Sequence, residues 1–382
     1  MRAPRLHLVP GAALAVLLAT SGPVRAQERP AAAALAEEPA DGVEITRTPP
    51  VTVRITAGGV TREVTLVGRT KTRLAFTEGS SPYGTRRLLD RTQVEYAWFD
   101  LVIDDYELNK DLRRRNWRGA ARRLLPAVKP ALPYLDLPNN NAASFALQVG
   151  DYLMRDAERA FLLAATEEEE KAALDTYRSA YAVLRYAGRA DWYSGGLIAS
   201  LKSYQCLLAL GKPKTARLYL QDFAEPIEGD AAFGLYWLLT AELAAESGDF
   251  RKAMGAAVKS LCFETKDVDT FPDALLLSAR CYEELQEWHR ARDVYYEVAR
   301  IFPKTDWSDF ARRRLAFIMA KGLTAAEEET PIENVFFGLK EDMNGLVTEL
   351  LARREEEADE PAEPDDDAWE PVAVEFVEEE EE

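Results

Sequence analysis

The residues that could do chemistry in this chain are few and scattered. It contains two histidines, His7 and His289, and three cysteines. Nucleophilic catalysis needs a histidine beside a Ser or Cys, and a zinc site needs several His or Cys ligands at short spacing. The spacings between the histidines and cysteines of this chain fit neither arrangement. They also do not fit a Cys-x-x-Cys redox pair. We therefore predict no catalytic residue, no metal site and no cofactor, and we expect His289 to be a solvated residue at a helix turn.

Glycine pairs and carboxylates are the other places where chemistry could occur. Gly58-Gly59 and Gly195-Gly196 lack the spacing of a phosphate-binding or dinucleotide-binding loop, and turns account for both pairs. The chain has 65 acidic residues, and a glycosidase needs only two. An exported glycosidase or lyase built as a helical barrel therefore stays open as the alternative. Closely joined helices leave few loops for such a carboxylate pair, so we predict that the protein is not an enzyme.

The cysteines raise the question of a disulfide. Cys206, Cys262 and Cys281 all lie among apolar helix residues, and free cysteines are often buried. We therefore favour small buried thiols in helix cores. A bond between Cys262 and Cys281 would link adjacent hairpins of an exported chain, and that pairing stays open.

A basic segment, DLRRRNWRGAARR at residues 111–123, is the sharpest charged feature. It could dock an acidic partner, an anionic envelope polymer or the acidic tail of the same chain. A solvated helix face is the alternative. Trp117 is expected to point into the core. The candidate partner-binding arginines are Arg113, Arg114, Arg118 and Arg122.

Most of the net charge of −18 belongs to the last 28 residues, which contain 16 acidic and no basic side chains. Mutual repulsion and little apolar surface predict that residues 355–382 are disordered when unbound. Within them, WEPVAVEFV alternates apolar residues in the way of a peptide that adds to an exposed sheet edge. A tethered recognition motif and a tail that only maintains solubility both stay open. The motif residues are Trp369, Val372, Val374 and Phe376.

The first 26 residues have the layout of a secretory signal peptide. Arg2 and Arg5 precede an apolar run from Leu8 to Ala19, and the segment ends Val24-Arg25-Ala26. Cleavage is expected after Ala26, which predicts an exported and periplasmic protein that has no membrane span after signal removal. An exported chain would rarely meet nucleic acid, and the charge balance does not suggest it. Residues 27–42 are poor in bulky apolar side chains and are predicted to be a flexible linker.

Residues 43–101 contain short runs rich in β-branched and aromatic residues. VTVRIT, EVTLVG, TRLAF and QVEYAWF are separated by glycines and by the segment GSSPYG. Four or five strands in some sixty residues predict a small β-barrel of SH3-like or Sm-like type.

From residue 102 to about 325, apolar residues recur at steps of three and four, which predicts helices. Leu275, Ala279 and Tyr282 fall on one helix face, and Ala291 and Tyr295 fall on the face of the next helix. The connection at residues 286–287 is so short that the two helices must lie antiparallel. The two alanines are small where their neighbours are large, which predicts a close crossing of the helices. Arg292 is expected on the surface.

This hairpin resembles a tetratricopeptide repeat, a helix pair with the pattern W-x2-L-G-x2-Y, then A-x3-F, then P. Weaker copies begin at Leu207 and Trp237. The resemblance implies an all-α superhelical solenoid that binds a protein or peptide partner. An apolar seam at residues 330–354 predicts a capping helix that seals the end of the repeats, and dimerisation through this seam is the alternative. The residues that carry the repeat pattern are Leu275, Ala279, Tyr282, Ala291, Tyr295 and Pro303.

Together these patterns predict an α+β protein, with a small SH3-like or Sm-like β domain followed by helical repeats. We expect a non-catalytic extracytoplasmic scaffold that serves cell-envelope assembly or maintenance by holding a protein or peptide partner. The sequence does not identify that partner or the oligomeric state.

Overall fold

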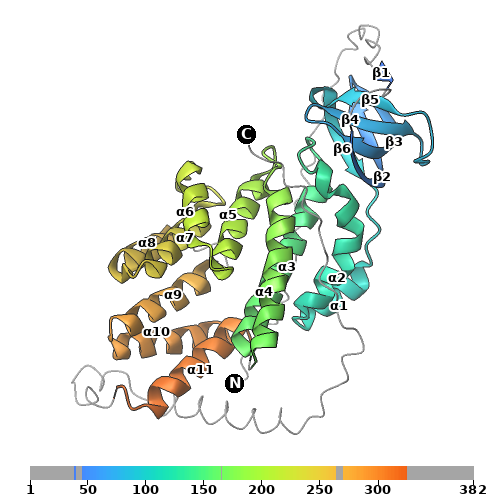
Figure 1. Cartoon of the computed structure of the whole chain (residues 1–382). Coiled ribbons are helices and arrows are strands. Elements are labelled where there is room, and N and C mark those ends of the chain that lie inside the picture. Colours follow the sequence, from blue (N-terminus) through green and yellow to red (C-terminus); the bar gives the residue numbers. More distant parts are fainter. Residues whose placement is uncertain (1–37, 40–44, 165, 264–269, 325–382) are drawn as a thin grey trace, which may run out of the picture. The chain divides into compact units, whose positions relative to one another are not determined.

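A curled antiparallel sheet precedes a series of helices in this chain (Figure 1). The structure is a computed structural model, and it describes residues 38–39, 45–164, 166–263 and 270–324. The predicted signal peptide, capping helix and acidic tail, with Trp369, Val372, Val374 and Phe376, lie outside the described residues. Because the strands come before the helices and do not alternate with them, the fold is α+β, as the sequence predicts.

The sheet is built mainly from four consecutive strands and a fifth that returns to the first of them. Gly58 and Gly59 form the turn between β2 and β3 with φ angles of 55° and 73°, a left-handed conformation that glycine adopts without steric cost. The strands are β1 (Glu38–Pro39), β2 (Thr46–Ala57), β3 (Val60–Arg69), β4 (Arg73–Glu78), β5 (Arg87–Asp90) and β6 (Val94–Phe99), in the spatial order β1-β5-β4-β3-β2-β6. The short 3-10 turn η1 (Arg91–Gln93) leads from β5 into β6.

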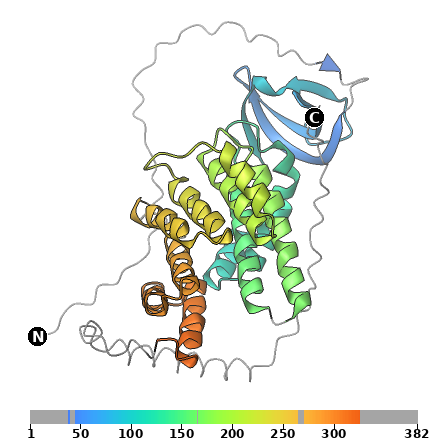
Figure 2. The ribbon, with the colours of Figure 1, turned by 60° about the vertical axis from the view of Figure 1, so that its left-hand side comes forward.

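Two sequence predictions for this region need correction. Within the described residues β1 and β6 are the two edges and do not pair with each other, so the sheet is a curled half-barrel and not a closed barrel (Figure 2). Glu38 and Pro39 lie inside the predicted linker, yet they pair with Leu88 and Arg87 of β5. An unpaired edge strand attracts a backbone partner, and β1 fills that position.

The remaining described chain is helical from residue 105 onward. The capping residues Asp104, Asn116, Thr166 and Thr305 each accept a backbone N–H at the start of a helix. The helices are α1 (Asp105–Arg113), α2 (Trp117–Val128), η2 (Lys129–Tyr134), α3 (Ala142–Leu163), α4 (Glu167–Ala187), α5 (Ser194–Ala209), α6 (Pro213–Asp222), α7 (Phe233–Glu246), α8 (Phe250–Phe263), α9 (Thr270–Glu284), α10 (Trp288–Ile301) and α11 (Asp306–Ala320).

The α9–α10 hairpin has the packing that its sequence predicts. Ala279, Ala291 and Tyr295 have no exposed surface and lie in one hydrophobic cluster with Leu275. Tyr282 packs against this cluster from its edge. The small alanines therefore sit in the interior of the helix pair.

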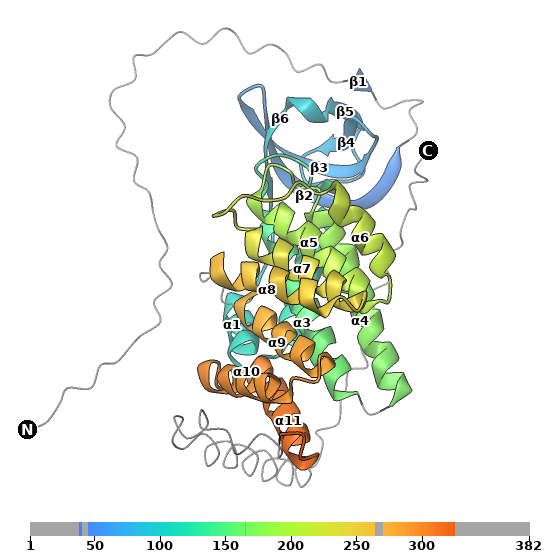
Figure 3. The same ribbon diagram turned by 90° about the vertical axis from the view of Figure 1, so that its left-hand side faces the viewer.

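The hairpins α5–α6, α7–α8 and α9–α10 are stacked along the long α3–α4 pair (Figures 1 and 3). The first helices of successive pairs touch one another, since α3 contacts α5, α5 contacts α7, α7 contacts α9, and α9 contacts α11. We call α3, α5, α7, α9 and α11 the first helices. Because each first helix contacts the next one along the chain, the helical region is solenoid-like.

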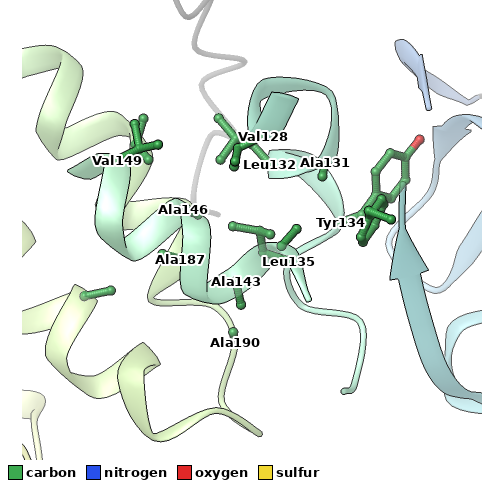
Figure 4. Close-up of a cluster of buried hydrophobic side chains, with 14 of the residues drawn as sticks. Val128, Ala131, Leu132, Tyr134, Leu135, Ala143, Ala146, Val149, Ala187 and Ala190 are labelled. Atoms are coloured by element: carbon green, nitrogen blue, oxygen red, sulfur yellow. The ribbon is translucent and has the colours of Figure 1, made fainter. Parts of the chain in front are cut away.

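The sheet and the first hairpins share one hydrophobic core. Val53 and Phe99 of the sheet belong to the same buried cluster as Leu124 and Val149 of the helices. Tyr134 of η2 points from this cluster toward the sheet (Figure 4), and its hydroxyl is hydrogen-bonded to Thr48 of β2. The sheet is therefore packed onto the helices and not attached by a free linker.

Three consecutive asparagines fix this junction, and the sequence analysis missed them. Asn141 donates to the carbonyl oxygen of Phe99 at 2.9 Å and accepts its N–H at 2.8 Å. Asn139 donates to the carbonyl oxygen of Glu95 at 3.0 Å. Asn140 is buried and accepts the N–H of Ala143 at the start of α3. The side-chain amides of Asn139 and Asn141 are thus hydrogen-bonded to backbone groups of edge strand β6.

Three single-residue expectations are wrong. Cys262 is exposed, whereas Cys206 and Cys281 are buried as expected, and all three thiols are free. Arg292 is buried with 8% of its surface exposed. His289 is partly buried and not fully solvated. Among the described residues, no helix combines the length and the apolar character that a membrane span requires.

Candidate binding surface

The four arginines predicted to bind a partner do not form one surface. Arg113 and Arg114 are exposed at the end of α1. Arg118 points to α3, where its Nε lies 3.0 Å from the Oδ2 atom of Asp156, and Arg122 is partly buried. Only Arg113 and Arg114 of the four are therefore exposed residues.

Neighbouring residues of the same basic segment tie the first hairpin to the last described helix. Arg115 donates to Asp306 of α11 at 3.0 Å, and the indole N–H of Trp117 donates to the same carboxylate at 3.2 Å. Trp117 is partly buried and stacks on Tyr152 of α3, so it does not enter the core as expected. Part of the basic segment thus has a structural role, because these contacts join residues about 190 positions apart in the chain.

A second set of polar residues lies where α3 and α4 approach the first helices α5, α7 and α9. Hydrogen bonds and electrostatic interactions connect its members, which come from five helices. We call this set the inner polar cluster, and it consists of Asp151, Arg155, Glu158, Tyr177, Lys202, Gln205, Glu242, Asp273 and Arg280.

Asp151 is the well-compensated carboxylate of the inner polar cluster. Lys202 of α5 donates to its Oδ1 atom, and Arg155 donates to its Oδ2 atom at 3.0 Å. Burial opposes ionisation, but the two cations and their hydrogen bonds outweigh it and hold the pKa of Asp151 below its ordinary value. This ion group links α3 to α5.

Glu242 of α7 has a different environment. Its carboxylate accepts the side-chain amide of Gln205 at 3.2 and 3.3 Å, and Gln205 is a neutral donor. Burial raises the pKa of Glu242 to about 7, with a further contribution from the negative charge of Asp273, while the Gln205 bond and Arg280 act against it. The hydrogen bonds from the neutral Gln205 amide do not offset the free-energy cost of desolvating the ionised Glu242 carboxylate.

Glu158 of α3 is the least compensated acid. It forms no hydrogen bond or ion pair with any residue that the structure describes, and its side chain reaches solvent. The surrounding protein raises its pKa to about 8 by desolvation, and the carboxylates of Asp273 and Asp151 add to the shift. Lys202 and Arg155 lower the pKa, but both cations already serve Asp151.

Tyr177 of α4 completes this side of the cluster. Only 7% of its surface is exposed. Burial raises the pKa of its hydroxyl, and the nearby acids Glu158 and Glu242 raise it further. Its hydroxyl oxygen is not one of the buried side-chain atoms that lack a hydrogen-bond partner in the described ranges.

The inner polar cluster combines one carboxylate whose pKa is lowered with two carboxylates whose pKa values are raised. No group of three or more His, Cys, Asp or Glu side chains in the described part of the chain could hold a metal ion. Two carboxylates whose pKa values lie near 7 and 8 also meet one requirement of a general acid. These raised pKa values retain the paired-carboxylate alternative.

One comparison with known proteins bears on the role of these helices. A family model described as tetratricopeptide repeat matches residues 273–305, which cover most of α9 and all of α10. The chain fits a tetratricopeptide-like repeat protein. The match includes all six residues that carry the repeat pattern, with Leu275 buried and Pro303 exposed after the end of α10. No curated protein matches this chain.

The inner polar cluster was missed in the sequence because its members are far apart in the chain. Asp151 and Lys202 are separated by 51 positions, and Gln205 and Glu242 by 37. One local signal was present, since Asp151, Arg155 and Glu158 follow the spacing of a single helix face. A charged stripe on a long helix is usually solvated, so the spacing alone does not indicate a site.

Proposed function

We propose that this protein is a non-catalytic scaffold that binds a protein or peptide partner on the first helices of a superhelical solenoid. The observation that carries the proposal is the repeat match at α9–α10 together with the contacts that connect successive first helices. Repeat arrays of this kind form extended binding surfaces, because each hairpin adds one more helix to a continuous face.

The place of action is part of the same proposal. The basic, apolar and small-residue layout of residues 1–26 supports export and a role in cell-envelope assembly or maintenance. For the sheet we propose an SH3-like identity, because β6 returns beside β2 after the 3-10 turn η1 and closes the strand order β6-β2-β3-β4-β5. An SH3-like module packed on repeats would give the scaffold a second surface.

The proposal is tested by photo-crosslinking at two matched positions. A photoreactive amino acid replaces Arg280 on first helix α9, or Arg251 on α8, the second helix of its hairpin; both arginines are exposed. After export in the native host, adducts with a defined partner are expected from position 280 and not from position 251. Equal adducts from both positions would remove the first helices from the proposal.

A carbohydrate-active enzyme is the second candidate, favoured by the raised pKa values of Glu158 and Glu242. Envelope polysaccharides incubated with the wild-type protein should show no cleavage above background. Cleavage that is lost in a folded Glu158→Gln variant would support the enzyme and contradict the scaffold.

A further inference from the structure

We infer that the acidic segment at residues 355–382 docks on α6 and α8, the second helices of two hairpins of the same chain, through its WEPVAVEFV motif. This surface is distinct from the one in the proposed function, which places a partner on the first helices. We call it the second-helix face, and its exposed residues are Lys214, Arg217, Leu218, Arg251, Lys252 and Val258.

The first argument is the charge of the second-helix face. The helices α6 and α8 contain five basic residues, all exposed, and one acidic residue, Asp222. None of the five forms an ion pair with a described carboxylate, since Arg217 is bonded to neutral groups of α7 and Lys259 lies over an aromatic ring. The acids at the α7–α8 turn are Glu246 and Asp249, so positive charge remains in excess. A segment with 16 carboxylates and no basic residue complements this surface.

The second argument is that α6 and α8 are held along the same helix. At one end of α7, Arg217 of α6 donates to the hydroxyl of Ser247 at 2.6 Å, and α8 begins directly after that turn. At the other end, Phe223 stacks on Tyr236 with ring centroids 6.1 Å apart. Lys259 of α8 lies 3.5 Å from the centroid of the next aromatic ring of α7. The two helices therefore run in the same direction beside α7, and their cations belong to one region.

The third argument is the apolar surface exposed among these cations. Leu218 is 56% exposed and Val258 is 51% exposed. Leu218 lies one helical turn from Lys214, and Val258 lies two turns from Arg251, so each shares a helix face with a cation. The motif WEPVAVEFV has the matching composition, because its apolar side chains stand among carboxylates.

Two other places that the sequence suggested for this segment fit it less well. Addition to edge strand β6 would need backbone groups that Asn139 and Asn141 already bond. The exposed carboxylate of Asp100, directly after β6, would repel an acidic segment. In the basic segment at residues 111–123, three arginines are already paired with carboxylates of the described chain. The second-helix face has no such competing partner.

The chain is long enough to make this contact. The last described residue, Thr324, follows α11, and α9 contacts both α11 and α8. Packed helix axes lie about 8 to 10 Å apart, so two packing steps place α8 roughly 20 Å from α11. Even with the predicted capping helix at residues 330–354, the stretch 355–368 alone extends to roughly 45 Å.

The test is photo-crosslinking within the purified full-length chain. A photoreactive amino acid replaces Leu218 on α6 or, as the matched control, Leu197 on first helix α5, which is 50% exposed. Adducts are separated by mass, and the joined peptides are identified by mass spectrometry. We expect adducts at the mass of one chain that join position 218 to residues 369–377, and none to that segment from position 197.

Charge is tested by paired variants at a distance from the photoreactive position. Each surface ion pair contributes little by itself, so Arg251→Gln/Lys252→Gln should lower the adduct yield from position 218 by about twofold or more. The control, Arg178→Gln/Arg185→Gln, removes two exposed cations of α4 and should leave the yield unchanged.

The motif is tested by Val374→Ser/Phe376→Ser, which keeps every carboxylate and should also lower the yield. Equal yields from positions 218 and 197, or no effect of the Arg251/Lys252 or the motif variant, would overturn the inference. Adducts at the mass of two chains would assign the face to a second copy and would overturn it as well. The scaffold role is read separately, from adducts with another protein at positions 280 and 251.

Discussion

Replacing Ala291 with leucine tests the packing of the hairpin on which the repeat assignment depends. Ala291 has no exposed surface and lies in one cluster with Ala279, Tyr295 and Val298, which are also fully buried. The substitution adds three carbon atoms where the helices leave no free surface. Overpacking of this kind typically costs about 1 to 3 kcal/mol of folding free energy.

The expected effect is large enough to measure by thermal unfolding. A loss of about 1 to 3 kcal/mol corresponds to a lower melting temperature by roughly 2 to 12 °C for a domain of 150 to 250 residues. The assay is circular dichroism at 222 nm on the wild type and the variant. The matched control is Ala172→Leu, the same enlargement at an exposed position of α4, which should change the melting temperature little. Equal melting temperatures for the wild type and Ala291→Leu would refute the close crossing.

Three further predictions concern other contacts of the structure. A double-mutant cycle with Arg115→Ala and Asp306→Ala should give a coupling energy of about 0.5 to 1 kcal/mol in urea unfolding, because the pair is only partly shielded from solvent; zero coupling would contradict the contact between the first hairpin and α11. Asn141→Ala should lower the free energy of unfolding by about 1 to 3 kcal/mol, because the N–H and carbonyl groups of Phe99 lose their partner, whereas an unchanged urea midpoint would argue against the asparagine junction. Because the folded pKa of Glu242, about 7, lies above its unfolded value, the wild type loses stability as pH rises from about 4.5 to 7. The variant Glu242→Gln should therefore gain stability relative to the wild type between pH 4 and pH 8. A stability difference between the two proteins that stays constant over this range would show that the pKa of Glu242 is not raised.

Local sequence patterns were enough to predict the main strands, the helical region and one hairpin. Alternation of apolar residues marked β2 and β6, and the spacing of Ala279, Ala291 and Tyr295 marked the packed faces of α9 and α10. These features depend on neighbours within a few residues, or within one short hairpin, so a single sequence contains them.

The candidate surface depends on contacts between distant parts of the chain, and no local pattern contains those. The basic segment looked like one docking face, but Arg115 and Arg118 turn inward to α11 and α3. Arg292 looked exposed by its charge, yet it lies against the core of its hairpin. Whether a charged side chain is solvated or paired is decided by helices that come later in the sequence, as the ion pair of Arg115 with Asp306 of α11 shows.

The central claim is that a partner lies on the first helices, and hydrogen–deuterium exchange with the partner captured by crosslinking tests it most directly. Full-length protein is labelled with and without saturating partner, and exchange is compared for each helix. Binding on the first helices predicts slower exchange in α3, α5, α7 and α9, with no change in the second helices α6, α8 and α10. Slower exchange confined to the second helices or to residues 355–382 would contradict the claim.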